Sequence, residues 1–132
     1  MKKAVLRIFS TFLIVVLTVT LYYILCLVST NSVYNHVKKV VSREIIINDT
    51  NDPLYCYSDD TGIISGTAYS KCDFKRQYVF HNFKSGSMSI VFSEDIYNEK
   101  DELIHQYKNL QIIVYIEKQN GKWVVTNINH II

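Results

Sequence analysis

The clearest structural signal in this chain lies in residues 111–128, which read QIIVYIEKQNGKWVVTNI. The dipeptide Asn120-Gly121 favours a two-residue type I′ turn, because both central positions of that turn need a positive φ. Before the turn every second residue is apolar, as in a strand that buries one face. The pattern predicts a β-hairpin with a long strand over 103–118 and a returning strand over 122–131.

The turn also sets the register of this hairpin. Continued without a break, that register places two asparagines on the apolar face, Asn127 opposite Val114 and Asn129 opposite Ile112. A buried amide without a partner costs free energy, so two arrangements stay open. Either Ile112, Val114, Asn127 and Asn129 line a cavity, or a β-bulge turns the asparagines outward.

Two strands and a helix are expected upstream of this hairpin. Alternation predicts strands over 78–83 and 88–97, joined by a turn at 84–87. In residues 31–43 the valines recur at helical spacing and form one apolar stripe, which predicts an amphipathic helix. The expected fold class is therefore α+β, with one amphipathic helix packed on a curved antiparallel β-sheet.

The segment between this helix and the sheet carries weaker signals. Polar clusters at 49–53 and 59–62 are typical of turns. The apolar stretches around them predict short strands over 44–48, 54–57 and 63–69.

Residues 8–28 form a run of 21 residues without a charged side chain. A helix of this length spans about 31 Å, which matches the hydrocarbon thickness of a bilayer, about 30 Å. We therefore expect a transmembrane helix over 8–28, after a tail over 1–7 and before a domain over 29–132.

The charges before this run favour one orientation in the membrane. Lys2, Lys3 and Arg7 precede it without an acid among them, and such flanks usually stay in the cytoplasm. The expected protein is a single-pass plasma-membrane protein with an extracytoplasmic domain.

Two alternatives to an uncleaved anchor stay open. A signal peptide cleaved after Ser29 or Ser32 would give a secreted domain, but the apolar run is longer than the usual 7–15 residues and no A-x-A pattern is present. A lipoprotein modified at Cys26 is the other alternative, although the residues before Cys26 match that pattern poorly.

The three cysteines fit an external domain. Cys26 falls in the apolar run, which leaves Cys56 and Cys72 as an even pair outside it. In an oxidising compartment such a pair predicts a disulfide, worth about 3 kcal/mol in the chain-entropy account. Two free thiols packed as small apolar groups are the alternative. There is no Cys-x-x-Cys motif and no Cys/His cluster, so no metal or other cofactor is expected.

Charge and motifs disfavour several classes of function. The net charge is +2, but without Lys2, Lys3 and Arg7 the chain has 11 basic and 12 acidic residues, so no basic face for nucleic acid is expected. The sequence contains no G-x-S-x-G, P-loop or H-E-x-x-H motif, and its four histidines have no motif partner at a fixed spacing. We therefore expect a protein that is not an enzyme.

Tyrosine is the residue type that most favours binding. Eight of the ten tyrosines lie outside residues 8–28, and Tyr55, Tyr57 and Tyr69 are candidates for a binding surface. A compositional origin is the alternative, since strands favour tyrosine in any case.

The last 50 residues resemble the cystatin-like or nuclear-transport-factor-two-like superfamily, above all in 111–128 and in its Gly-Lys-Trp hairpin. A membrane anchor before such a domain resembles the bridging subunit of conjugation and type IV secretion machines. With the missing catalytic motifs and a Met-Lys-Lys start and composition that look bacterial, we expect a non-catalytic binding or scaffolding domain on the outer face of a bacterial membrane, with the lipid bilayer and proteins as partners. An assembly subunit of a conjugation or type IV secretion-like apparatus is one alternative. A small pocket enzyme is another, since enzymatic members place an Asp/His pair in the pocket.

Overall fold

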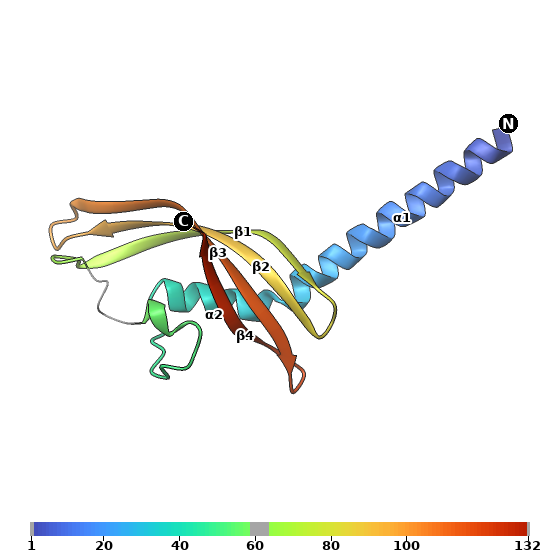
Figure 1. The fold of residues 1–132 in the computed structure, drawn as a ribbon. Helices are drawn as coiled ribbons and strands as arrows, with labels where there is room; N and C mark the ends of the chain where they lie inside the picture. Colours follow the sequence, from blue (N-terminus) through green and yellow to red (C-terminus); the bar gives the residue numbers. More distant parts are fainter. Residues whose placement is uncertain (1, 59–63, 132) are drawn as a thin grey trace.

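The computed structural model describes residues 2–58 and 64–131, and Figure 1 shows two helices followed by an antiparallel sheet. The elements in chain order are α1 (Lys2–Ser29), α2 (Asn31–Val41), the short 3₁₀-helix η1 (Tyr55–Tyr57), β1 (Tyr69–His81), β2 (Ser85–Tyr97), β3 (Leu103–Gln119) and β4 (Lys122–Ile131). Each strand pairs with the next, in the order β1-β2-β3-β4. The expected α+β class, with helices and a curved antiparallel sheet, is confirmed.

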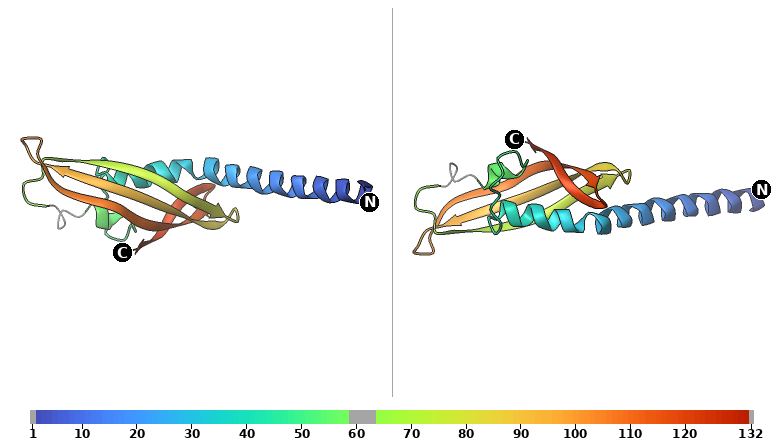
Figure 2. Two further views of the ribbon diagram at one scale, coloured as in Figure 1. Left: turned by 90° about the horizontal axis from the view of Figure 1, so that it is seen from above. Right: turned by 90° about the horizontal axis from the view of Figure 1, so that it is seen from below.

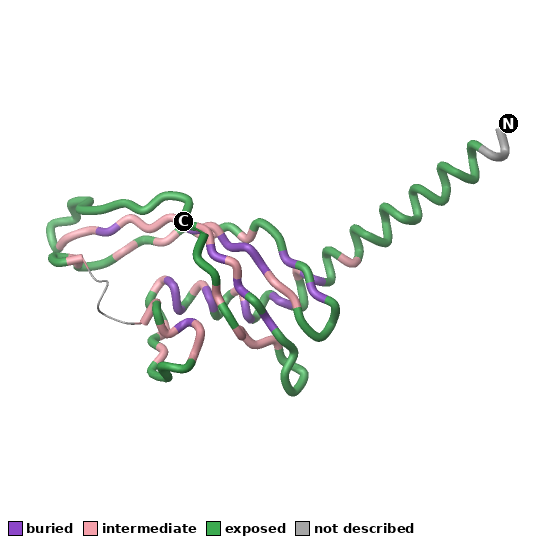
Figure 3. The backbone as a smooth tube through the Cα atoms, viewed as in Figure 1, coloured by how far each residue is buried: buried purple, intermediate pink, exposed green. Residues whose placement is uncertain are grey.

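Helix α2 lies across the concave face of the sheet (Figure 2). Its apolar stripe is buried, as the valine spacing predicts, and comprises Val33, Val37, Val40 and Val41. The stripe packs in one core with side chains from the middle of the strands, where Figure 3 shows the buried positions: Met88, Ile90, Phe92, Ile112, Val114 and Ile116. The amphipathic pattern of α2 is thus satisfied by the sheet.

Strand β1 is longer than the sequence predicts. It begins at Tyr69 rather than at residue 78, and it pairs with β2 from Tyr69–Tyr97 to His81–Gly86. Three charged side chains of its first half, Lys71, Asp73 and Lys75, are exposed on one face. Because of these charges the first half of β1 has few apolar residues. Only its pairing with β2 identifies it as a strand.

The three short strands expected before β1 are wrong for the residues that the structure describes. Residues 44–48 are irregular, 54–57 lie in and beside η1, and 64–68 form a turn and an extended approach to β1; residue 63 lies outside the described residues. Local hydrogen bonds explain the first part of this segment. Asp49 Oδ1 accepts the N–H of Asn51 at 2.9 Å, and Asp52 Oδ1 accepts the N–H of Leu54 at 2.8 Å. Such side-chain bonds compete with strand pairing.

The β3–β4 hairpin contains a β-bulge. Its turn has the positive φ angles of a type I′ turn, 50° at Asn120 and 79° at Gly121. Ile116 pairs with Val125, but Tyr115 pairs with Asn127, so Thr126 is the extra residue.

The bulge decides between the two arrangements of the asparagines. The expected opposition of Val114 to Asn127 is wrong, because Val114 pairs with Ile128. The expected opposition of Ile112 to Asn129 is also wrong, and both asparagines are exposed. Ile112 and Val114 lie in the core, 1% and 0% exposed, so these four residues do not line a cavity together. The extra residue places Ile128 opposite Val114, where the unbroken register would have buried the amide of Asn127.

The last two turns of α1 belong to the core of the domain. Cys26, which the sequence placed in the membrane-spanning run, is 0% exposed and packs in the same core as α2 and the sheet. The Arg76 guanidinium donates to the Leu27 carbonyl and to Thr30 Oγ1, each at 3.3 Å. Helix α1 is therefore joined to the sheet by residues 22–29, which we call the junction.

His81 is the buried polar centre of the junction. Its side chain is 1% exposed, and its ring centre lies 4.6 Å from that of Trp123. The Phe83 N–H donates to Nδ1 at 3.2 Å, so the proton of the neutral ring is on Nε2. Nε2 then donates to Ser29 Oγ at 2.7 Å. A neutral histidine thus connects α1, the β1–β2 turn and β4.

We expect the junction to weaken in mild acid. Burial lowers the pKa of His81, and the positive charge of Lys118 lowers it further. The unfolded chain therefore takes up the proton first, near its ordinary pKa of about 6.5. The contribution of neutral His81 to the free energy of unfolding is fully present above this pH. It decreases as the pH drops below this value. Thermal unfolding of the full-length protein in detergent, followed by circular dichroism at about pH 7.5 and about pH 5.5, measures this.

The variant His81→Gln should lose most of this pH dependence, because an amide can donate to Ser29 without titrating. The exposed His36 supplies the matched control, and His36→Gln should retain the wild-type dependence. Equal pH dependence in the wild type and His81→Gln would show that another group is responsible.

Candidate functional site

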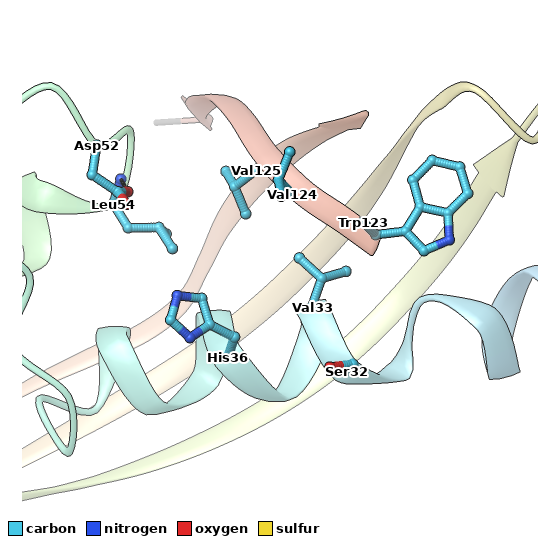
Figure 4. A pocket seen from close by; sticks show the side chains of 8 residues that line it. All are labelled: Ser32, Val33, His36, Asp52, Leu54, Trp123, Val124 and Val125. Atoms are coloured by element: carbon cyan, nitrogen blue, oxygen red, sulfur yellow. Dashed lines mark hydrogen bonds between the residues drawn. The ribbon is translucent and has the colours of Figure 1, made fainter. Parts of the chain in front are cut away.

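A hollow of about 340 Å³ lies between α2 and β4 (Figure 4). A single helix covers only the middle of a curved four-stranded sheet, and space therefore opens beside it. The residues that line this α2–β4 hollow come from α2, from the segment before η1 and from β4: Ser32, Val33, His36, Asp52, Leu54, Trp123, Val124 and Val125.

The floor of the α2–β4 hollow is apolar and its rim is polar. Val33 and Leu54 are 5% and 1% exposed, and both belong to the core. At the rim, Ser32 and His36 are exposed, and Figure 4 shows the His36 ring turned into the space above α2. A rigid apolar floor with a few polar groups is typical of a binding site for an apolar group.

Among the described residues that line this hollow, His36 and Asp52 do not form an acid/base pair. In Figure 4 the Leu54 side chain lies between His36 and Asp52. Asp52 Oδ1 accepts the Leu54 N–H of its own loop at 2.8 Å. Asp52 therefore shapes the loop, and the Asp/His geometry that a pocket enzyme requires is not assembled between these two residues.

A second hollow, of about 560 Å³, lies on the other side of α2, against β1. Its lining is mostly polar and carries both signs of charge: Asn35, Lys38, Lys39, Ser42, Glu44, Ser70, Cys72, Asp73 and Phe74. Lys38 Nζ lies 5.6 Å from the ring centre of Phe74, within the range of a cation–π contact. This α2–β1 hollow is a mostly polar groove.

The three candidate tyrosines do not form one surface. Tyr55 and Tyr57 belong to η1, where the Tyr57 ring centre lies 5.6 Å from that of His130. Burial raises the pKa of Tyr57. Tyr69 begins β1 instead, stacks on Tyr97 at 5.1 Å and donates to Asp101 at 2.8 Å. Tyr57 and Tyr69 thus pack against different neighbouring rings, and these contacts account for both side chains.

The expected disulfide between Cys56 and Cys72 is not formed, and both are free thiols. Cys56 is exposed in η1, where its thiol contacts the Pro53 carbonyl of its own turn at 3.9 Å. Cys72 lies in β1 and lines the α2–β1 hollow. The pair is separated because η1 packs towards β4 while Cys72 faces the end of α2.

Half of β3 has an open edge. Strand β4 pairs with β3 only from Gln111 to Gln119, so within the described part of the chain no strand pairs with the outer edge of residues 103–110. Apolar side chains are exposed here, and Leu103 is 51% and Tyr107 37% exposed. An open edge with apolar side chains is a site where another chain can add a strand.

No family model, no curated protein and no solved structure matches the chain. Function is therefore inferred from the two hollows, the open edge of β3 and the apolar helix α1. Sequence reasoning missed the α2–β4 hollow, since its residues come from three segments. Two local features of the sequence could have pointed to this hollow: Trp123 directly after the hairpin turn, and the isolated apolar Leu54 after a proline.

Proposed function

We propose that this protein is a membrane-anchored, non-catalytic binding domain on the outer face of a bacterial plasma membrane. The observation that carries the proposal is the junction, where the apolar helix continues into the domain core. Residues Val5–Ser29 are long and apolar enough to cross a membrane, with a mean hydropathy of 2.5, and this helix fits an anchor or a signal sequence. A helix that ends inside a domain holds that domain at a defined position.

Packing at the junction supports an anchor that is not cleaved. Cleavage after Ser29 would remove Cys26 from the core and the Ser29 hydroxyl from His81. It would also remove the carbonyl of Leu27 that Arg76 contacts. The positive residues before the apolar run support a cytoplasmic N-terminus.

The binding face in this proposal is the α2–β4 hollow, and its ligand is an apolar side chain of a protein partner. The volume of about 340 Å³ is at the lower end of ligand pockets. Val33, Leu54 and Val125 supply apolar contact, and Trp123 lies at the end of the hollow with its ring packed on His81. Asp52 accepts a backbone N–H of its own loop, and this structural role supports a function without catalysis.

An assembly subunit of a conjugation or type IV secretion-like apparatus is the second proposal. The open edge of β3 supports it, because strand addition at an edge is a common way to join subunits. Kinship with the cystatin-like superfamily also stays a proposal. It is supported by a helix across a curved sheet and by the Gly-Lys-Trp hairpin.

Photo-crosslinking in intact cells separates these proposals. A benzophenone amino acid replaces His36 at the hollow, Tyr107 at the open edge or the exposed Lys75 of β1 in the full-length protein. We expect one protein partner to be captured from position 36 and none from position 75. Capture from position 107 alone would favour the assembly subunit, and capture from none of them would contradict both.

Blocking variants test whether the hollow itself is used. Ser32→Trp fills the α2–β4 hollow, so capture from position 36 should be lost. Asn35→Trp is the matched control, because Asn35 lies on α2 but lines the α2–β1 hollow. Equal capture in both variants would show that the partner binds elsewhere.

A further inference from the structure

One end of the sheet lies beside α1 and is rich in exposed aromatic rings. This hairpin end comprises residues 80–86 at the β1–β2 turn and 117–123 at the β3–β4 turn, and Figure 1 shows the β1–β2 turn next to the end of α1. Phe80 is 60% and Phe83 53% exposed. Both rings still contact Tyr22 of α1, with ring centres 5.8 and 5.9 Å apart.

The length of α1 places this contact inside the outer leaflet of a bilayer. Ile8 is the first residue after Arg7, and Tyr22 follows it by 14 residues, a rise of about 21 Å. A bilayer has a hydrocarbon core of about 30 Å. A helix that begins its span near Arg7 therefore cannot leave the hydrocarbon before Tyr22. The aromatic rings that pack on Tyr22 must then reach the same depth.

The charge of the hairpin end fits a lipid surface. Lys84, Lys118 and Lys122 are exposed there, against one acidic residue, Glu117. The Lys118 N–H donates to the Lys84 carbonyl at 2.7 Å, which joins the two turns into one surface. Aromatic rings at the depth of the outer leaflet, with lysines beside them, are a composition that suits a leaflet with anionic headgroups.

We propose that the hairpin end docks on the outer leaflet of the bilayer, with Phe80 and Phe83 against the upper acyl chains and the three lysines on anionic headgroups. The domain then lies against the membrane with a second contact besides α1. This inference rests on the proposed anchoring by α1. It also explains why two phenylalanines are exposed beside a turn of an otherwise polar end.

Fluorescence quenching by brominated lipids tests the docking. The full-length protein is placed in nanodiscs of phosphatidylcholine and phosphatidylglycerol, with bromine on the upper acyl chain. Trp123 is the only tryptophan, so Trp123→Phe supplies a dark background. In that background a single reporter is introduced by Phe83→Trp or by Phe80→Trp. The second reporter is needed because Phe83 has a positive φ of 69°, whereas Phe80 lies in a strand.

Two further reporters separate the possible outcomes. Phe12→Trp reports on the span of α1, and Tyr107→Trp reports on the distant open edge of β3. We expect fluorescence loss at positions 12, 80 and 83 and none at position 107. Loss at position 12 but at neither 80 nor 83 would overturn the docking and leave the anchor standing. No loss at position 12 would overturn the anchor itself.

The lysines have their own test in the same system. Nanodiscs of phosphatidylcholine alone remove the anionic headgroups, so fluorescence loss at position 83 should become smaller. The loss at position 12 should not change, because it depends on the apolar span. Equal loss at position 83 in both lipids would overturn the contribution of Lys84, Lys118 and Lys122.

Discussion

Replacement of Gly86 by valine is expected to lower the free energy of unfolding by more than about 3 kcal/mol. Gly86 pairs with His81 across the β1–β2 hairpin. A Cβ at position 86 would overlap the Phe80 carbonyl oxygen and lie 2.5 and 2.7 Å from Cβ and Cα of His81. Two of these three atoms are backbone atoms, so they cannot rotate away. The hairpin would have to open and release His81 from Ser29 and Trp123.

Chemical denaturation of the full-length protein in detergent, followed by circular dichroism, measures this loss. Ser85→Val is the matched control, because Ser85 is the exposed neighbour in the same strand and valine suits an exposed strand position. The control should change the free energy of unfolding by less than about 0.5 kcal/mol. Should Gly86→Val fail to fold, Gly86→Ala gives a smaller loss at the same place. Wild-type stability in both Gly86 variants would contradict the packing at this turn.

Removal of residues 1–29 is expected to cost about 4 kcal/mol or more, a large share of the 5–15 kcal/mol that stabilises a typical domain. Cys26 is 0% exposed and would leave an empty site in the core. The packing of Tyr22 and Leu27 would be lost as well, together with the hydrogen bond from His81 to Ser29. Thr30 and His81, both buried, would meet water.

Two fragments make the comparison direct. The fragment 30–132 lacks the whole junction, whereas 21–132 keeps it and lacks only residues 1–20. We expect a cooperative thermal transition and dispersed proton resonances for 21–132, and neither for 30–132. The same transition midpoint in both fragments would show that the domain does not need α1. It would also remove the main argument against a cleaved signal peptide.

Local patterns in the sequence predict several elements correctly. Asn120-Gly121 predicts the type I′ turn and the bounds of β4, because the positive φ angles of that turn are a property of two residues. Valine spacing predicts α2, which ends two residues before the expected position. Both signals are contained in a few consecutive residues, so no distant part of the chain is needed to interpret them.

Other elements depend on partners that are distant in the sequence. The first half of β1 is identified only by its pairing with β2. The bulge is one of two arrangements that the sequence leaves open, and only the pairing of β3 with β4 places it at Thr126. The α2–β4 hollow combines residues from three segments. Its shape follows from how far one helix can cover a curved sheet, which no local pattern contains.

Helix α1 shows where local information ends. Hydropathy alone is enough to predict a long apolar helix over its residues, because apolar side chains are expelled from water whatever receives them. Hydropathy does not show whether lipid tails or a protein core surround these side chains. The sequence therefore placed Cys26 in the membrane run, whereas the folded chain buries it beneath α2 and the sheet. That assignment needed the sheet, whose His81 and Arg76 bond Ser29 and the Leu27 carbonyl at the end of α1.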